Sequence, residues 1–194
     1  MSNLRARRRA ETARMIQKAT IELVNEQGFD AVTSEAISRH AGVSPRTFFN
    51  YFPNKEAAIF GEVPSLPDAD IQAFLSGSGP ERGDLYRLMR AHTLKAGERR
   101  DELKLIVSLV QTQPRMMEIY MAQREIIGGA LAELLSQRFR DSTPIFLAIL
   151  AHSLLSMSWT AIQHWLETDR PLDLAFEEAW QALTVVSQLI LKED

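Results

Sequence analysis

The sequence predicts an all-α protein in which a compact N-terminal three-helix unit precedes a larger helical bundle. Apolar residues recur at helical spacing through most of the 194 residues. No sustained alternation of apolar and polar residues occurs, and no Asn-Gly or Asp-Gly pair joins two β-branched runs, so the signals of strands and hairpins are lacking. Prolines precede several of the periodic stretches, as is typical of the first position of a helix.

The first helix is predicted from about Thr12 to Gln27. Its stripe repeats at helical spacing and consists of Ala13, Ile16, Thr20, Leu23 and Val24. Gly28 follows the last turn, where a residue in the left-handed conformation commonly ends a helix. Phe29, which comes next, is expected to pack beneath the core.

Three short helices are predicted to follow, from Ser34 to about Ala41, from Pro45 onward, and from about Asn54 toward Glu62. Thr33 and Ser44 precede the first two and are the expected N-caps, because a hydroxyl oxygen can accept a hydrogen bond from the first turn. Pro45 suits the first helical position, where its missing N–H leaves no hydrogen bond unmade.

The larger part of the chain is predicted to be a helical bundle. Residues 63–84 are expected to be irregular because prolines and glycines recur in them, at Pro64, Pro67, Gly77, Gly79, Pro80 and Gly83. Helices are predicted at residues 85–96, 101–112, 114–140, 144–167 and 172–192. Gly128-Gly129 interrupts the third of these and is a candidate hinge. We place the domain boundary after residue 55, so that residues 1–55 and 56–194 form two domains.

Charge is divided unevenly along the chain. The net charge is −3, but residues 1–55 contain nine basic and five acidic residues, a net charge of +4 that leaves −7 for the remainder. A basic head on an acidic body indicates two surfaces with different partners. Cysteine is absent, which excludes disulfides and thiolate metal sites and suits the reducing cytoplasm.

Neither secretion nor membrane insertion is expected. Glu11, Arg14 and Lys18 interrupt any apolar segment after the basic N-terminus, so a secretory signal is not predicted. The stretch between Asp141 and Glu167 carries no charge, yet it holds many hydroxyl, amide and imidazole groups that are costly to place in a bilayer. A buried helix of a soluble protein is the better interpretation.

Enzymatic and metal chemistry are poorly supported. The four histidines are never three or four residues apart, no nucleophile elbow occurs, and no glycine-rich loop could hold a phosphate. No cofactor and no metal are therefore expected, and the protein is not predicted to be an enzyme. A helical enzyme acting on lipids or acyl chains stays the alternative from a different functional class.

The most informative segment runs from Thr33 to Lys55 and reads TSEAISRHAGVSPRTFFNYFPNK. It predicts a short helix, a tight Ala41-Gly42-Val43 turn and a second short helix, the helix-turn-helix arrangement in which the second helix enters the DNA major groove. Residues with the spacing to face the first helix are Ile37, Ala41, Val43, Phe48 and Phe52. This leaves Pro45, Arg46, Phe49, Asn50 and Tyr51 on the outside, although Phe49 could alternatively belong to the core.

The chain resembles the TetR family of transcriptional regulators over about its first sixty residues. The matching residues are Ile16, Ala19, Leu23, Gly28, Phe29, Thr33, Ile37, Ala41-Gly42-Val43-Ser44, Thr47-Phe48-Phe49, Tyr51-Phe52 and Lys55-Glu56-Ala57. The departures are Phe49, where many relatives have tyrosine, and Tyr51, where histidine is frequent.

The resemblance implies a role for each residue of the motif. Pro45, Arg46 and Phe49 stand where the family meets base edges or thymine methyl groups, and of these Arg46 can bind guanine through two hydrogen bonds. Residues at the positions that grip phosphates are Thr33, Ser44, Thr47, Tyr51 and Lys55, and Asn50 could serve either purpose. Lys55 could alternatively be a solvated lysine. The Arg5–Arg9 cluster could be a minor-groove arm or a disordered tail.

The last two predicted helices are apolar on nearly all sides, which indicates burial against a partner as well as within the subunit. The family resemblance implies that they form the four-helix interface of a homodimer. The residues predicted for this interface are Leu150, Leu154, Met157, Trp165, Phe176, Trp180, Leu183 and Val186. A purely intramolecular core is the alternative.

The middle helices are candidates for an effector pocket, because they mix flexible apolar side chains with a few polar ones. The predicted ligand-binding residues are Met89, His92, Leu105, Leu109, Met117, Tyr120, Met121 and Arg124. A plain core is the alternative for this methionine stripe. The arginine-rich start, the Arg-Thr-Phe-Phe-x-Tyr-Phe-Pro-x-Lys form and the short middle are similar to actinobacterial relatives that sense acyl-CoA-like ligands.

Together these observations predict a cytoplasmic bacterial homodimer that binds a palindromic operator in double-stranded DNA. We expect a repressor that a small hydrophobic or acyl-type effector releases from DNA. An activator of the same architecture is the alternative within the family.

Overall fold

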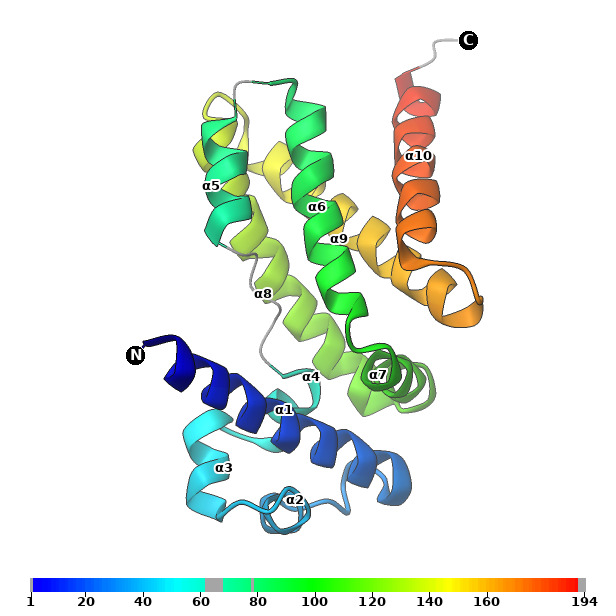
Figure 1. Cartoon of the computed structure of the whole chain (residues 1–194). Coiled ribbons are helices and arrows are strands. Elements are labelled where there is room, and N and C mark those ends of the chain that lie inside the picture. Colours follow the sequence, from blue (N-terminus) through cyan, green and yellow to red (C-terminus); the bar gives the residue numbers. More distant parts are fainter. Residues whose placement is uncertain (1, 62–67, 78, 192–194) are drawn as a thin grey trace. The chain divides into compact units, whose positions relative to one another are not determined.

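The computed structural model describes residues 2–61, 68–77 and 79–191, and these residues form ten α-helices and no strand (Figure 1). The predicted all-α class is therefore confirmed. The chain divides into two compact units. We call residues 1–63 and 101–122 the N-terminal unit, and residues 64–100 and 123–194 the body unit. Each is described separately below.

The N-terminal unit is built around one long helix. Its elements are α1 (Ser2–Gln27), α2 (Ser34–His40), α3 (Pro45–Tyr51), α4 (Lys55–Phe60), α7 (Arg100–Thr112) and the first part of α8 (Pro114–Arg138). The side chains that they bury in one shared core include Ile16, Ile21, Val24, Ile37, Phe48, Ile59, Leu109 and Met116. α1 packs against α2 and α4, and α2 packs against α3.

Local signals set the ends of the short helices. The side chains of Thr33, Ser44 and Asn54 each accept a hydrogen bond from the backbone N–H three residues later, which satisfies a donor that the helix itself leaves free. Gly28 and Gly42 have φ values of 82° and 67°, a left-handed conformation that favours glycine after α1 and in the turn between α2 and α3. The predicted caps and turns are thus present.

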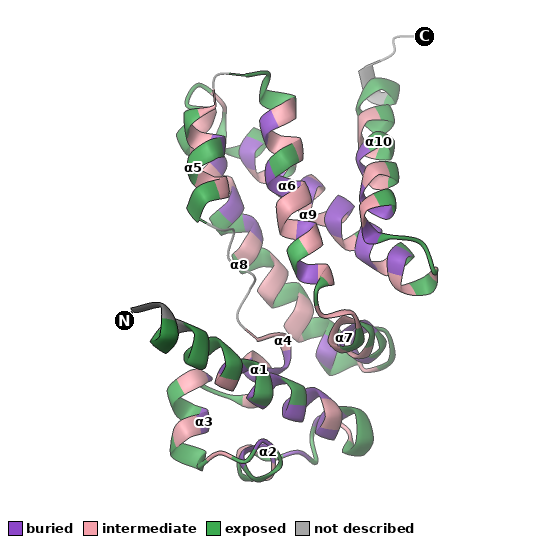
Figure 2. Ribbon diagram, in the orientation of Figure 1, coloured by how far each residue is buried: buried purple, intermediate pink, exposed green. Residues whose placement is uncertain are grey.

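The body unit contains α5 (Asp68–Ser76), α6 (Glu81–Gly97), the second part of α8, α9 (Pro144–Glu167) and α10 (Leu172–Leu191). α9 packs mainly against α10 and also against α6, and α6 packs against α5 and α10. Its core includes Phe74, Leu88, Met89, Leu135, Leu154 and Phe176. Figure 2 shows buried segments recurring along α9, in agreement with its eight buried residues.

A buried ionic cluster joins the start of α6 to α8. Asp84 is 3% exposed and accepts hydrogen bonds from Arg87 and from Arg138, whose Nη2 lies 2.7 Å from Oδ2. Arg138 also donates to the carbonyl oxygen of Gly77 in the α5–α6 connection. Since a buried carboxylate is costly without partners, both arginines stabilise Asp84, and Arg138 also links α8 to α6 and to the connection after α5.

The sequence analysis placed the start of the first helix too late and predicted too long an irregular segment after residue 62. α1 begins at Ser2 rather than near Thr12, so the Arg5–Arg9 cluster is helical and is not a disordered tail. The described side chains in this first part of α1 are mostly exposed, and its sequence has no apolar stripe. The helix propensity of arginine and alanine was therefore the only sequence signal for a helix there.

The segment predicted to be irregular contains α5 and the beginning of α6. Its prolines and glycines delimit α5 rather than prevent it, since Phe74 of α5 is buried against the body core. Residues 63–67 and residue 78 of the same predicted segment lie outside the described residues.

α9 is the one helix in the described part of the chain that is long and apolar enough to cross a membrane by length and composition. Within the body unit α9 packs against α6 and α10. Its buried residues are Leu147, Ala151, Leu154, Met157, Ser158, Ala161, Ile162 and Trp165. One side of α9 is thus covered by its own unit, while Ile145, Phe146 and Ile149 of the same helix are exposed.

The two glycines within α8 differ in their surroundings. A Cβ added at Gly128 would lie 2.5 Å from Cε1 of His152 on α9, whereas a Cβ at Gly129 would meet nothing within 4 Å. Gly129→Ala is expected to raise the free energy of unfolding by about 0.5–1 kcal/mol, because alanine favours the helix. Gly128→Ala should lack this gain, since His152 and its contact with Glu125 must shift.

Urea unfolding of the two variants measures this difference. In a His152→Ala background the Gly128→Ala substitution should stabilise as much as Gly129→Ala does. Equal stabilisation by both substitutions in the parent chain would contradict the close approach of α8 and α9.

Candidate nucleic-acid interface

α3 is a short amphipathic helix with one face anchored in the core. Ser44 Oγ lies 3.0 Å from the Thr47 amide and 2.8 Å from the Thr47 hydroxyl, and Pro45 occupies the first helical position. Phe48 and Phe52 are buried in the N-terminal core. The buried aromatic side chains and the cap together fix which residues of α3 face outward.

The outward face of α3 carries residues that suit a DNA major groove. Pro45, Arg46, Phe49 and Asn50 are exposed, as Figure 2 shows for this helix. The side chain of Phe49 is 51% exposed, so it is not part of the core. A guanidinium can donate two hydrogen bonds to guanine, an amide can pair with adenine, and an exposed aromatic ring can contact a thymine methyl group.

Hydroxyl groups flank this face at the starts of α2 and α3. Thr33 and Ser44 are exposed caps, and Thr47 is half-buried beside Ser44. Tyr51, the last residue of α3, is half-buried against the core. Such groups, together with backbone N–H groups at helix starts, are the usual phosphate ligands of DNA-binding proteins.

Lys55 is held by the backbone of the loop between α1 and α2. Its Nζ donates to the carbonyl oxygens of Phe29 and Val32, at 2.7 and 2.9 Å, and lies 4.2 Å from the centroid of the Phe29 ring. It is therefore not a freely solvated lysine. The two carbonyls leave one ammonium donor for a further ligand.

The predicted effector-binding residues fall into both units. Those of the N-terminal unit are Leu105, Leu109, Met117, Tyr120 and Met121, and those of the body unit are Met89, His92 and Arg124. Met89 and Leu109 are buried in the cores of their own units, whereas Met117 and Met121 are exposed. The eight predicted effector-binding residues are thus divided between the two units, five in the N-terminal unit and three in the body unit.

Two polar members of this set have defined surroundings in the body unit. Arg124 donates to the hydroxyl of Ser156 and approaches the carbonyl oxygen of His152. Burial lowers the pKa of His92, and the positive charge of Lys95 lowers it further. A lowered pKa disfavours the charged imidazolium, so His92 is poorly suited to bind an anionic ligand through its charge.

The residues predicted for a dimer interface are mostly buried within the subunit. Leu154, Met157, Trp165, Phe176 and Trp180 are buried, Leu150 and Leu183 are half-buried, and Val186 is exposed. Exposed apolar side chains on the same two helices are Ile145, Phe146 and Ile149 of α9 and Leu174, Val185, Val186 and Leu189 of α10. Sequence reasoning missed most of these, because a helix that is apolar all round does not reveal which side its own subunit covers.

Comparisons with known proteins agree with this geometry. Residues 16–60 match the family model described as bacterial regulatory proteins of the tetR family. The chain is 29% identical over 170 residues to MftR of Mycobacterium tuberculosis, named as a transcriptional regulator of mycofactocin biosynthesis, with 84% of each protein covered. It is 26% identical over 203 residues to the HTH-type transcriptional regulator TcmR of Streptomyces glaucescens, covering 93% of this chain and 86% of TcmR.

A solved structure shows the same fold. Thermus thermophilus FadR, a TetR family repressor determined in complex with lauroyl-CoA, has a TM-score of 0.55 and 24% identity to this chain. The match covers 89% of this chain and 93% of that structure.

The contacts of Lys55 lead to a stability test. Lys55→Ala removes two charge-assisted hydrogen bonds to backbone carbonyls and is expected to lower the free energy of unfolding by about 2 kcal/mol. Lys18→Ala is the matched control, because Lys18 is exposed and its ion pair with Glu22, at 3.8 Å, is a surface pair of little energetic value. This substitution should change the free energy of unfolding by less than about 0.5 kcal/mol. Chemical unfolding measures both, and equal small effects would show that Lys55 does not hold the loop.

Proposed function

The chain belongs to the TetR family of transcriptional regulators, and on this premise we propose that it is a ligand-responsive repressor acting in the bacterial cytoplasm. The observation that carries this proposal is the exposed face of α3, where Arg46, Phe49 and Asn50 project from a helix anchored by Phe48 and Phe52. An exposed aromatic side chain beside an arginine and an amide suits a partner with both apolar and hydrogen-bonding groups, and the major groove of DNA offers thymine methyl groups and base edges.

In the proposed complex, α3 lies in the major groove. Arg46 binds guanine, Phe49 contacts a thymine methyl group, and Asn50 binds either a base or a phosphate. The phosphate ligands are Thr33, Ser44, Thr47, Tyr51 and the remaining donor of Lys55. The hydroxyl groups set the register of the helix on the duplex, while sequence is read by the side chains of its outer face.

We propose that the protein acts as a homodimer. A helix of seven residues reads few base pairs, so a second copy related by a two-fold axis is needed for a palindromic operator. The exposed apolar side chains of α9 and α10 support this, because they would otherwise stay in contact with water. In this interface the half-buried Leu150 and Leu183 join the exposed residues, which include Val186. The buried members of the predicted set pack beneath them within the subunit.

We propose an acyl-type or similarly hydrophobic effector. Support comes from the flexible apolar side chains of the middle helices and from FadR of the same fold, whose structure contains lauroyl-CoA. The effector must bind better to the conformation with low DNA affinity, since only a difference in affinity can shift the equilibrium.

Selection of binding sites from random DNA by the purified protein tests the proposal. A palindromic consensus is expected, and a lack of palindromic preference would contradict it. A series of acyl-CoAs of increasing chain length is then tested by thermal shift and by release of the selected DNA. A ligand that raises the melting temperature and lowers DNA affinity supports a repressor, whereas one that raises DNA affinity would overturn the proposed direction of control.

Arg46→Ala is expected to weaken binding to the selected operator by about 1–3 kcal/mol and to relax the preference at one base position. The reason is the loss of the hydrogen bonds from Arg46 to guanine. The operator places a guanine at this position, whereas random DNA does so only by chance. Fluorescence anisotropy with operator and random duplexes measures the difference. The same loss on both duplexes would refute base reading by Arg46.

Charges placed among the exposed apolar residues should dissociate the dimer. Ile149→Glu and Leu189→Glu alter side chains that are 62% and 63% exposed in the subunit, so the subunit fold should tolerate them. Light scattering after size-exclusion chromatography should show monomers. Met15→Glu is the control, because it places the same charge on an exposed apolar residue of α1, outside the proposed interface, and it should leave the dimer intact. Dimers that persist in the first two variants would exclude this interface.

A further inference from the structure

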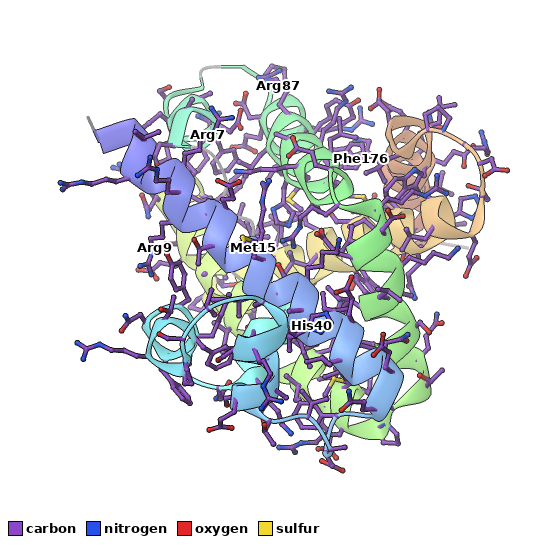
Figure 3. All side chains as sticks on the ribbon, turned by 60° about the horizontal axis from the view of Figure 1, so that its bottom comes forward. Arg7, Arg9, Met15, His40, Arg87 and Phe176 are labelled. Carbon is purple, nitrogen blue, oxygen red and sulfur yellow. The ribbon has the colours of Figure 1, made fainter. Side chains whose placement is uncertain are left out.

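The first turns of α1 bring an arginine to the end of the recognition helix α3. Cζ of Arg9 lies 4.9 Å from the centroid of the Tyr51 ring, and Tyr51 is the last residue of α3. Figure 3 shows Arg9 on the side of α1 that faces α3, and Arg7 on the other side of the helix. The arginine cluster is therefore divided between two faces of one helix.

Helical geometry explains this division. Arg5, Arg9 and Ala13 are four residues apart, so they share one side of α1, and Ala13 is buried in the N-terminal core. Arg5 and Arg9 continue this side beyond the point where the core ends. Arg7 precedes Arg9 by two residues, which places it about 200° around the helix.

The contact with Tyr51 leaves Arg9 available to a ligand. A guanidinium above an aromatic ring is held there by its attraction to the ring face, and this contact uses no hydrogen-bond acceptor, so its five N–H donors can still bind a ligand. Within the described part of the chain, no carboxylate lies within ion-pair distance of Arg9. Arg9 is also exposed. The ring thus holds a positive charge in place without neutralising it.

We propose that Arg9, supported by Arg5 one turn earlier, binds a phosphate of the DNA backbone beside Tyr51, at the edge of the half-site that α3 reads. This inference rests on the proposed function, because it needs α3 in the major groove. The Tyr51 ring acts as a platform for the guanidinium, and its hydroxyl is directed to the same stretch of backbone. A phosphate is the ligand that suits a planar cation with free in-plane donors, and such a contact adds affinity without reading sequence.

Comparison of Arg9→Ala with Arg7→Ala tests the assignment, since both remove one positive charge from exposed positions of the same helix. Arg9→Ala is expected to weaken binding roughly tenfold, equally on operator and random DNA. It should also reduce the slope of log K against log salt by about 0.9, the value for one lost phosphate contact. Arg7→Ala should change affinity less than about twofold and leave the slope unchanged.

Ethylation of single phosphates locates the contact. One phosphate at the edge of the half-site should weaken binding of the parent protein when ethylated and have no effect on the Arg9→Ala variant. Arg9→Lys should fall between the parent and Arg9→Ala, because lysine keeps the charge but does not stack on the ring in the same way. Circular dichroism and thermal unfolding check that each variant is folded.

Three results would overturn the proposal: equal losses for Arg9→Ala and Arg7→Ala, unchanged binding by Arg9→Ala, or a loss confined to the operator. The first would indicate a general electrostatic effect, and the last would indicate base reading. If the parent protein selects no DNA sequence, the proposed function itself fails, which is a distinct outcome from these three.

Discussion

A seven-residue helix is not stable alone in water, and this constraint governs how the N-terminal unit is built. α2 and α3 both have this length, so they depend on hydroxyl caps at their first turns and on side chains buried against α1. Phe48 and Phe52 provide this burial for α3, and they sit four residues apart on one side of it. Because the buried side is fixed, the opposite side is fixed as well. The functional face of α3 is therefore a consequence of its core packing.

The long helix α1 serves this arrangement in two ways. Its central and C-terminal turns supply core side chains such as Ile16 and Val24, which share one core with side chains of α2, α3 and α4. Its exposed first turns carry arginines past the core to the end of α3, where the Tyr51 ring orients Arg9. Lys55 acts from the other direction by fastening the loop after α1 to the start of α4. The positive charges around α3 are thus held by specific contacts and are not merely abundant in the sequence.

The body unit differs from the N-terminal unit in that its last two helices, α9 and α10, expose several large apolar side chains. α9 buries one stripe against α6 and α10 and still exposes Ile145 and Ile149, and α10 exposes Val186 and Leu189 in the same way. These exposed apolar side chains are the basis of the proposed dimer interface. The acidic charge of the residues after position 55 suits a region that does not approach phosphates. Dimerisation and effector control, as proposed, belong to this unit and to the middle helices.

The sequence by itself determined the helical class, the caps at Thr33 and Ser44, the left-handed Gly28, the turn at Gly42 and the outward face of α3. These features follow from local signals, since a cap, a turn or an apolar period involves residues close together in the chain. Only the tertiary structure decided that α1 begins ten residues earlier, that α5 exists and that Lys55 binds loop carbonyls. It also decided that Arg9 stacks on Tyr51 and which sides of α9 and α10 are buried. These features depend on contacts between residues distant in sequence, and an exposed arginine turn or a helix apolar on every side carries no pattern that identifies its neighbour.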